Sequence, residues 1–228
     1  MKKTFVSIII PTYNEEKYLE KTLRALENQD CKEKYEIIVA DGGSKDKTLK
    51  IAERHKTKIV ITKKRGIAIG RNAGAKVAKG EILIFIDSDT VPNSSLIKSY
   101  VKVFKDKEIL AATGPLVPLT KRKTNKKMWE TLYKLYNKLQ YLSIKMGKPV
   151  FCGCNSAYRK RIFKEVGGFP DKFPAEDSGL SLIVAKFGKT EFSNDAYVYT
   201  SLRRYEKMGL LNCFWFYFLP TIEGVLKI

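Results

Sequence analysis

Short apolar runs alternate with segments of helical spacing through the first half of the chain. The apolar runs predict β-strands at Phe5–Ile10, Tyr35–Ala40, Lys58–Thr62 and Ile82–Ile86. The intervening segments predict helices over Glu15–Asn28, from a cap at Asp46 to about His55, and around Arg71-Asn72 before Gly80. Strands that alternate with helices in this way predict a parallel sheet covered by helices on both faces.

The second half continues this pattern less regularly. It predicts a helix at Asn93–Phe104, a strand at Ile109–Val117, a strand-and-loop segment at Val150–Tyr158, a helix at Leu180–Phe187 and a strand at Thr190–Thr200. The predicted fold class is therefore α/β, with a mostly parallel sheet flanked by helices.

A long amphipathic segment, Met128–Met146, follows a basic linker at Lys121–Lys127. Its apolar residues near helical spacing are Trp129, Leu132, Leu135, Tyr136, Leu139 and Leu142. Packing of this stripe on the core is the favoured interpretation. A helix that lies on a membrane surface or binds the acceptor is the alternative, because basic residues flank the segment.

The C-terminal segment, Gly209–Ile228, is rich in apolar and aromatic residues. Pro220, Glu223 and Lys227 interrupt it, so it is shorter than the roughly 18 uninterrupted residues of a spanning helix. We expect an aromatic C-terminal helix over residues 206–228. Its run Phe214–Phe218, with the basic linker, predicts peripheral contact with an anionic membrane, while packing on the core or on another subunit is nearly as well supported.

Composition narrows the function classes. The 228 residues include 43 Lys+Arg against 24 Asp+Glu, and the resulting net charge of +19 favours a polyanionic partner such as a phosphorylated small molecule, a nucleic acid or an anionic membrane. The chain has four cysteines and one histidine, and the single-residue spacing of Cys152 and Cys154 does not match a zinc knuckle. His55 is expected in an exposed helical stretch, so carboxylates are the expected proton-transfer groups. The start of the chain does not resemble a signal peptide, which predicts a cytoplasmic protein, at the inner face of the cell membrane if it binds lipid.

Two carboxylates follow the fourth predicted strand, at Asp87 and Asp89. Open parallel sheets bind ligands beyond the carboxyl ends of their strands. Mg²⁺ and Mn²⁺ favour carboxylate and phosphate oxygens, so this pair is a candidate metal site. Asp-x-Asp is also common as a turn or helix cap, and the motif alone favours that simpler interpretation.

Several motifs, in order along residues 4–209, together resemble a family-two glycosyltransferase with a GT-A fold. The first strand and its loop, Val6–Glu15, resemble the nucleotide-binding start of the family, and Asp41-Gly42-Gly43-Ser44 resembles its second nucleotide contact. Asp87-Ser88-Asp89 stands where the metal motif belongs. The remaining matches are Arg65-Gly66, Arg71-Asn72 with Gly74, Gly153-Cys154-Asn155, and Glu176-Asp177 with Leu180.

The resemblance implies a role for each matching residue. Asp177 is the implied catalytic base, and Asp89 with help from Asp87 is the implied ligand of Mn²⁺ or Mg²⁺. Implied donor-binding residues are Pro11, Thr12, Tyr13, Glu15, Asp41, Arg65, Arg71, Asp87, Ser88 and Asp89. Implied acceptor-side residues are Gly153, Asn155, Glu176, Arg203 and Arg204.

Physical chemistry supports the donor-binding roles. The ring of Tyr13 offers a face for a nucleobase, Asp41 an acceptor for a base N–H, and Glu15 an acceptor for ribose hydroxyls. Arg65 and Arg71 would place positive charge near a diphosphate, although a solvated helix face is the simpler explanation for each arginine in so basic a chain.

The implied reaction is an inverting transfer from a UDP- or GDP-linked sugar to a glycan or lipid-linked acceptor. Transfer of a single sugar is favoured, because Ser201–Tyr205 replaces the Gln-x-x-Arg-Trp motif of processive members. The expected division is a catalytic domain over residues 1–205, with a nucleotide part at 1–117 and an acceptor part at 128–205.

Two other functions stay open from the residues themselves. A sugar-phosphate nucleotidyltransferase is disfavoured, because Pro11–Asn14 has no glycine-rich loop. A basic nucleic-acid-binding protein is disfavoured because the sequence contains no recognised nucleic-acid module.

Overall fold

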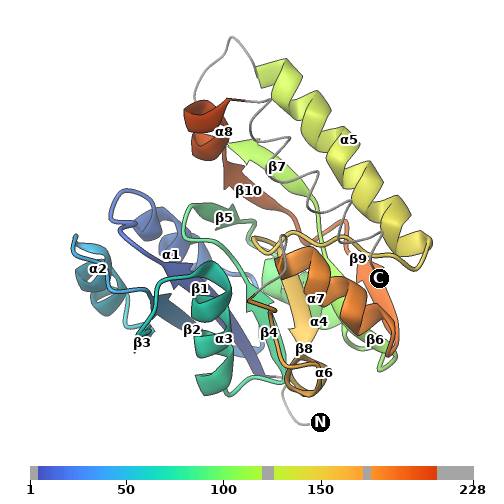
Figure 1. Cartoon of the computed structure of the whole chain (residues 1–228), viewed down its shortest axis with the longest axis horizontal. Coiled ribbons are helices and arrows are strands. Elements are labelled where there is room, and N and C mark those ends of the chain that lie inside the picture. The colour runs from blue at the N-terminus through green and yellow to red at the C-terminus, as the bar shows by residue number, and fades with distance from the viewer. Residues whose placement is uncertain (1–4, 120–125, 172–175, 210–228) are drawn as a thin grey trace.

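The protein folds around a large, mostly parallel β-sheet (Figure 1). The computed structural model describes residues 5–119, 126–171 and 176–209. Within these residues the large sheet has the order β3-β2-β1-β4-β8-β6-β9. Its strands are β1 (Phe5–Thr12), β2 (Lys34–Asp41), β3 (Lys58–Ile61), β4 (Ile82–Phe85), β6 (Ile109–Thr113), β8 (Ser156–Arg159) and β9 (Lys189–Phe192). All neighbouring pairs are parallel except those that β8 forms with β4 and β6.

The central strands are buried on both faces, as their continuous apolar runs predict. Along β1, Ile8 and Ile10 pack in one apolar cluster while Ile9 packs in the other. The same alternation separates Ile84 from Phe85 on β4. Each of these strands therefore contacts the helix layers on both faces of the sheet.

Helices from the two halves of the chain cover these faces. One cluster contains residues of α1 (Leu19–Glu27), α2 (Thr48–Arg54) and α4 (Leu96–Val103), and the other contains residues of α3 (Ile67–Val77), α6 (Lys160–Glu165) and α7 (Glu176–Ala185). The long helix α5 (Lys126–Lys145) packs along β7 and β9, at the margin of the molecule in Figure 1. The short helix α8 (Arg203–Met208) follows the last strand.

A small sheet stands beside the carboxyl ends of the large one. It contains β5 (Thr90–Pro92), β10 (Val198–Ser201) and β7 (Leu116–Leu119), in that order. The sequence predicted single strands at 109–117 and 190–200, and this was wrong in both places, because each segment divides between the two sheets. The division occurs where Gly114 meets Ala196, since a Cβ at Gly114 would lie 2.0 Å from the Ala196 carbonyl oxygen. Only glycine allows this contact, and Pro115 then removes a donor from the strand.

The first helix begins later than predicted, at Leu19 instead of Glu15. Residues 14–18 instead form a loop in which Asn14 has a φ of 54°. The Glu15 N–H donates to Thr48 Oγ1 at 2.7 Å, so the loop is held by the start of α2. The N-cap of α2 is Lys47 and not the predicted Asp46, but the Asp46 carboxylate still accepts the Thr48 N–H at the start of the helix, at 2.9 Å. The loops after β1 and β2 are therefore fastened to each other.

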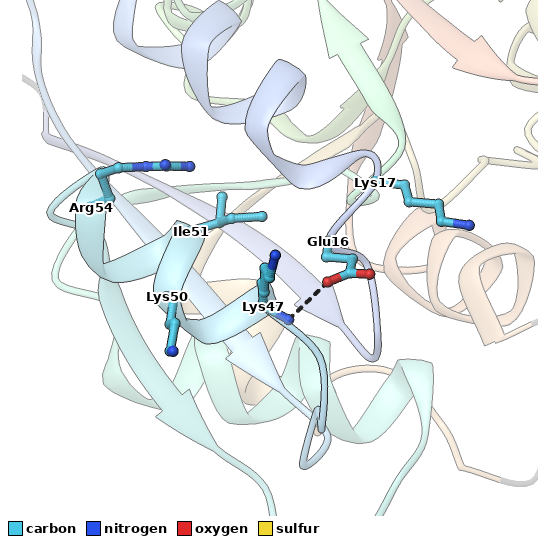
Figure 2. A pocket seen from close by; sticks show the side chains of 6 residues that line it. All are labelled: Glu16, Lys17, Lys47, Lys50, Ile51 and Arg54. Atoms are coloured by element: carbon cyan, nitrogen blue, oxygen red, sulfur yellow. Dashed lines mark hydrogen bonds between the residues drawn. The ribbon is translucent and has the colours of Figure 1, made fainter.

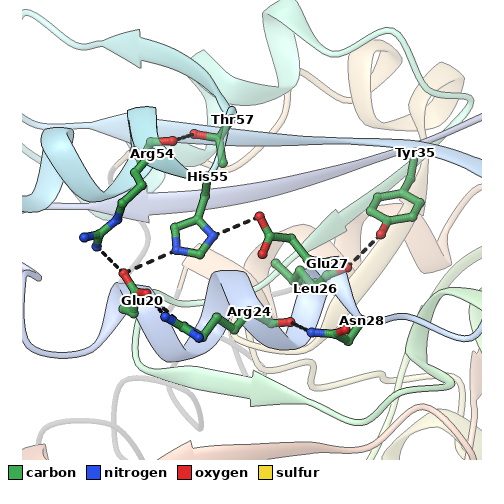
Figure 3. Close-up of polar contacts among 10 residues, drawn as sticks. Glu20, Arg24, Leu26, Glu27, Asn28, Tyr35, Arg54, His55 and Thr57 are labelled. Atoms are coloured by element: carbon green, nitrogen blue, oxygen red, sulfur yellow. Dashed lines mark hydrogen bonds and ion pairs between the residues drawn. The ribbon is translucent and has the colours of Figure 1, made fainter.

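His55 lies in a polar contact between α1 and α2 (Figure 3). Its side chain is only 9% exposed, so the prediction of an exposed histidine was wrong. Its Nδ1 lies 2.8 Å from Glu27 and its Nε2 3.3 Å from Glu20. This ring joins two helices and takes no part in the site described next.

The predicted basic linker and C-terminal helix are only partly covered. Residues 121–125 of the linker and residues 210–228, with the aromatic run Phe214–Phe218, lie outside the described residues.

Candidate active site

Asp87 and Asp89 lie in the link between β4 and β5, at the carboxyl end of the central strand. The Thr90 N–H donates to the Asp87 carbonyl at 3.1 Å, so the segment does form the turn that the motif alone favoured. The Ser88 carbonyl accepts a 2.8 Å hydrogen bond from Thr22 of α1, which fixes the turn against that helix. The carboxylates themselves do not cap the turn. Each one contacts an arginine from a distant part of the chain.

Arg71 of α3 lies inside the protein between two of these carboxylates. Its side chain is 2% exposed, with Nη2 at 2.9 Å from Asp87 Oδ1 and Nη1 at 3.2 Å from Glu176 Oε1. Burial lowers the pKa of this guanidinium, but the charges of Asp87, Asp177 and Glu176 outweigh burial and raise it overall. Arg71 therefore neither lies on a solvated helix face nor points freely toward a diphosphate. It connects the Asp-x-Asp turn to the start of α7.

Asp177 lies in the first turn of α7. The Gly153 N–H donates to its Oδ2 at 2.7 Å, and the Ser178 N–H donates to its Oδ1 at 2.9 Å. Gly153 also packs against Arg71, because a Cβ at Gly153 would lie 2.2 Å from Arg71 Nη1. The loop before β8, the buried arginine and the predicted base therefore form one contact network.

Glu176 shares this network. Burial and the charge of Asp177 raise its pKa, while Arg71 lowers it. The side chain is 22% exposed, so it reaches the surface of the site but is anchored beneath it.

Arg203 of α8 covers Asp89. Its Nε lies 2.6 Å from Asp89 Oδ2, its Nη2 lies 2.7 Å from Glu15 Oε1, and its guanidinium lies 4.4 Å from the centre of the Tyr18 ring. The neighbouring Arg204 is exposed on the same short helix. The structure thus brings the predicted Glu15, Asp89 and Arg203 together, and Tyr18 is a further partner that the motifs did not indicate.

Asp89 carries an unusual proton affinity. Burial and the nearby charge of Asp87 raise its pKa to about 6, although Arg203 opposes this shift. Such a shift is expected where several carboxylates share a poorly solvated position. Glu15 Oε2 is also buried there without a hydrogen-bond partner.

These residues fit a hard divalent cation. Among the described residues, no group of three or more His, Cys, Asp or Glu side chains is arranged to hold a metal by itself. Mg²⁺ and Mn²⁺ usually take one or two carboxylates and complete their coordination with water and substrate phosphates. Asp89, with its raised proton affinity, and Asp87 are two carboxylates of that kind, and in this structure the positive charge beside Asp89 is that of Arg203.

The two loops that follow β1 and β2 form the predicted nucleotide side. The guanidinium of Arg65, an exposed residue, lies 3.7 Å from the centre of the Tyr13 ring. Pro11 packs against α3, since a Cβ at Gly70 would lie 3.1 Å from Pro11 Cβ. Asp41 is fully buried and accepts hydrogen bonds from Thr12 Oγ1, both N–H groups of Gly43 and Ser44, and Ser44 Oγ. Its carboxylate thus shapes the loop that a nucleobase would meet.

Asn155 is placed differently from the expectation of an acceptor contact. It is fully buried, its Oδ1 accepts from Tyr100 at 2.6 Å, and its Nδ2 donates to the Ala196 carbonyl at 2.8 Å. It holds the crossing between the two sheets in place. Gly153, two residues earlier, does face the site.

Tyr136 of α5 is partly buried against the core cluster that contains Cys154, as is Cys152 of the loop before β8. Burial raises the pKa of its phenol well above the usual range, with further contributions from Cys152 and Asp177. The sequence placed Tyr136 only within an apolar stripe, and nothing in its spacing distinguishes it from the leucines there.

A shallow depression of about 430 Å³ lies apart from this network, between the start of α1 and α2 (Figure 2). Its lining residues are Glu16, Lys17, Lys47, Lys50, Ile51 and Arg54. None of them is a predicted site residue, and the Lys47 N–H donates to Glu16 within the wall.

The sequence matches a known protein family. The family model described as "Glycosyl transferase family 2" matches residues 7–167. The chain is 40% identical over 113 residues to the uncharacterized glycosyltransferase YfnE of Bacillus subtilis, a match that covers 47% of this chain and 29% of that protein. It is 38% identical over 125 residues to a dolichyl N-acetyl-α-D-glucosaminyl phosphate diacetamido-dideoxy-glucuronosyltransferase of Methanococcus voltae, covering 50% of this chain and 39% of that protein.

The fold is similar to that of solved glycosyltransferases. The mannosyltransferase PcManGT from Pyrobaculum calidifontis, solved in complex with GDP-Man and Mn²⁺, aligns with a TM-score of 0.73 and 26% identity over 87% of this chain and 57% of that one. The matches therefore cover less than two thirds of each of these proteins, with 29% and 39% of the two curated relatives and 57% of the PcManGT chain.

Proposed function

Because the chain belongs to glycosyl transferase family 2 and has the GT-A fold, we propose that it transfers a single sugar from a nucleotide-diphosphate sugar to an acceptor hydroxyl with inversion at the anomeric carbon. The observation that carries this proposal is the position of Arg71. It binds Asp87 of the Asp-x-Asp turn on one side and Glu176, next to Asp177, on the other. The buried Arg71 guanidinium thus sets the spacing between the Asp-x-Asp turn and the start of α7.

The donor is bound by the loops after β1 and β2 and by the Asp-x-Asp turn. The Tyr13 ring and the Arg65 guanidinium, which stack on each other, offer flat surfaces for the base of a UDP- or GDP-linked donor. Asp41 contributes to donor binding indirectly, because its carboxylate fixes the loop after β2 that the base would contact. Glu15 has one buried oxygen without a partner, which suits a ribose hydroxyl or a metal-bound water.

Asp89 and Asp87 would hold Mn²⁺ or Mg²⁺, and the similar fold of PcManGT was solved with Mn²⁺ and GDP-Man bound together. When bound, the ion would neutralise the charge of the departing nucleoside diphosphate. Arg203 supplies a second positive charge at this position. It must leave Asp89 when an ion binds there, and it is then free to contact a diphosphate.

Asp177 acts as the general base. It takes the proton of the acceptor hydroxyl as that oxygen bonds to the anomeric carbon and the bond from this carbon to the diphosphate oxygen breaks. The N–H groups of Gly153 and Ser178 fix the orientation of the carboxylate. Glu176 is bound to Arg71 and serves to position the network.

The acceptor is a glycan or a lipid-linked sugar. Gly153 and Glu176 contact the Asp177–Arg71 network, and we assign Arg204 of α8 to the acceptor side as a ligand for an anionic group. Asn155 contributes by holding the loop before β8 in place and not by contact with the acceptor.

Two matched variants test this proposal. Asp177→Asn should bind donor with normal affinity in calorimetry but lose about 10²–10⁴-fold in turnover, measured as nucleoside-diphosphate release with an acceptor mixture from a cell extract. Glu176→Gln should lose far less turnover. If Asp177→Asn released nucleoside diphosphate at nearly the normal rate, Asp177 would not be the base.

A further inference from the structure

Helix α5 has two apolar faces, and only one of them packs on the protein. Its inner face contains the buried residues Trp129, Tyr133, Gln140 and Ile144. The other face is an exposed stripe of leucine and methionine side chains, which we call the outer stripe. Its residues are Met128, Leu132, Leu135, Leu139 and Leu142, together with Met146 just past the end of the helix, and their exposed fractions are 39% to 76%.

This arrangement corrects the favoured prediction that the apolar residues of this segment pack on the core. Of the stripe predicted from sequence, Trp129 packs in the core and Tyr136 packs against it, whereas the four leucines face outward. At 100° per residue, the outer stripe lies within about 40° of one line along the helix. A contiguous exposed apolar surface of this length is unusual for a protein that meets only water.

Lysines follow one side of the outer stripe. Lys127, Lys134, Lys138 and Lys145 are all exposed and lie about 80–120° around the helix from the stripe, on the side away from the buried face. Lys148 follows just after the helix and is also exposed. Leucines beside a row of lysines give a surface with an apolar centre and a cationic edge.

We propose that the outer stripe of α5 docks the protein on an anionic membrane surface, with the helix parallel to the bilayer. Leucine side chains would enter the headgroup boundary, and the lysine row would bind lipid phosphates, with the amines reaching outward past the apolar edge. No helix in the described part of the chain is long and apolar enough to cross a membrane.

Charge favours a membrane over a second copy of the chain. Paired helices usually place opposite charges beside their apolar seam. In α5 the only acidic residue is Glu130, which lies 3.8 Å from Lys126 of the same helix. A pair of such helices would set lysine rows near each other, whereas anionic lipid neutralises them at about 1 kcal/mol for each lysine.

Membrane docking would also orient the site. Trp129 on the inner face of α5 packs against Tyr205 of α8, with 5.2 Å between the ring centres, and α8 also carries Arg203 of the site. The acceptor side of the site would then lie close to the lipid headgroups. This last step rests on the proposed function, and it identifies the acceptor as lipid-linked.

Vesicle co-sedimentation of the full chain tests the docking. We expect binding to phosphatidylcholine vesicles that contain phosphatidylglycerol, loss of binding at high salt, and little binding to phosphatidylcholine alone. Leu135→Ser/Leu139→Ser should abolish binding, while the control Ile61→Ser/Phe187→Ser, at positions 56% and 55% exposed elsewhere, should bind normally. Lys134→Glu/Lys138→Glu should weaken binding by about 25-fold or more, and Lys105→Glu/Lys107→Glu should change it far less.

Three results would overturn the proposal. One is wild-type protein that stays in the supernatant with anionic vesicles at low salt. Another is unchanged binding of Leu135→Ser/Leu139→Ser together with loss of binding when residues 210–228 are deleted, which would assign the contact to that segment. The third is a dimer in solution that the leucine variant disperses, without any vesicle binding. The Asp177→Asn chain should bind vesicles like the wild type, so failure of docking and failure of the catalytic assignment are distinguishable.

Discussion

Arg71 and Asp87 form an ion pair inside the protein, with 2.9 Å between Nη2 and Oδ1 and an arginine side chain that is 2% exposed. They are 16 residues apart, on α3 and on the turn after β4. The same guanidinium holds Glu176 from the other end of the chain. We therefore expect both stability and the proposed catalysis to depend on this one side chain.

Arg71→Met should lower the free energy of unfolding by about 3–5 kcal/mol, because it leaves two carboxylates partly buried without their cation. Urea denaturation measures this change. The matched control is Arg24→Met, which removes an exposed pair with Glu20 and should cost less than about 1 kcal/mol. Equal effects of the two variants would contradict the central role of Arg71.

Gly153→Ala tests the contact between the loop and this arginine. The added methyl group would lie 2.2 Å from Arg71 Nη1, closer than real contacts allow, so the loop or the guanidinium must move. The Gly153 N–H then loses its alignment with Asp177, and we expect turnover to fall by at least about tenfold, with donor affinity in calorimetry nearly unchanged. In an Arg71→Ala background the guanidinium is absent, so the methyl group added at Gly153 has room. The stability cost of Gly153→Ala should therefore be much smaller in that background, and simple additivity of the two costs would refute the contact.

Much of the fold could be predicted from sequence because local pattern determines it. The apolar run at Ile82–Ile86 needs cover on both faces, and it is a central strand of the sheet. The division of residues 109–117 between two sheets was missed, because it depends on Gly114 meeting Ala196, a contact between segments far apart in sequence that no local pattern contains.

The sequence indicated which residues come together in the candidate site, but it indicated less well what each of them contacts. Asp87 and Asp89 lie where expected, because parallel strands direct their carboxyl ends to one edge. Glu176 and Asp177 are instead brought there by α7, whose first turn contacts Arg71 and Gly153. Burial of Arg71 and Asn155 depends on the packing of several elements, and their residue types alone favour exposure. The outer stripe of α5 illustrates the same limit, since periodicity indicates apolar residues on a helix but does not say which of them meets the core.

Arg203 should compete with a metal for Asp89. Its Nε is 2.6 Å from the Asp89 carboxylate, so an ion that binds there must displace it. Arg203→Met should therefore bind Mn²⁺ several-fold more tightly in calorimetry without donor, while turnover falls because a cation that can contact the diphosphate is lost. Arg204→Met, on the exposed neighbour, should leave the affinity for Mn²⁺ unchanged. Weaker binding of Mn²⁺ by Arg203→Met would show that the arginine supports the ion site and does not compete for it.

Asp89 should make stability depend on pH in an unusual direction. Its pKa is about 6 in the folded protein, against about 3.9 for an unfolded aspartate. Between these values the folded state holds the proton more tightly, so this group makes the protein less stable as pH rises from about 4 to 6, and the full cost remains above that range.

Asp89→Asn removes this cost, because the amide is neutral at every pH. At pH 7.5 the variant should unfold with a free energy about 1–3 kcal/mol higher than that of the wild type, and the gain should vanish below about pH 4. Urea denaturation across this pH range measures the difference. Mn²⁺ should reverse the order at neutral pH, since it binds and stabilises only the chain that keeps the carboxylate. A variant that is less stable than the wild type at pH 7.5 in chelator would mean that the Arg203 pair more than offsets the burial of Asp89. In that case the Arg203–Asp89 ion pair would stabilise the folded protein by more than the buried charge of Asp89 destabilises it.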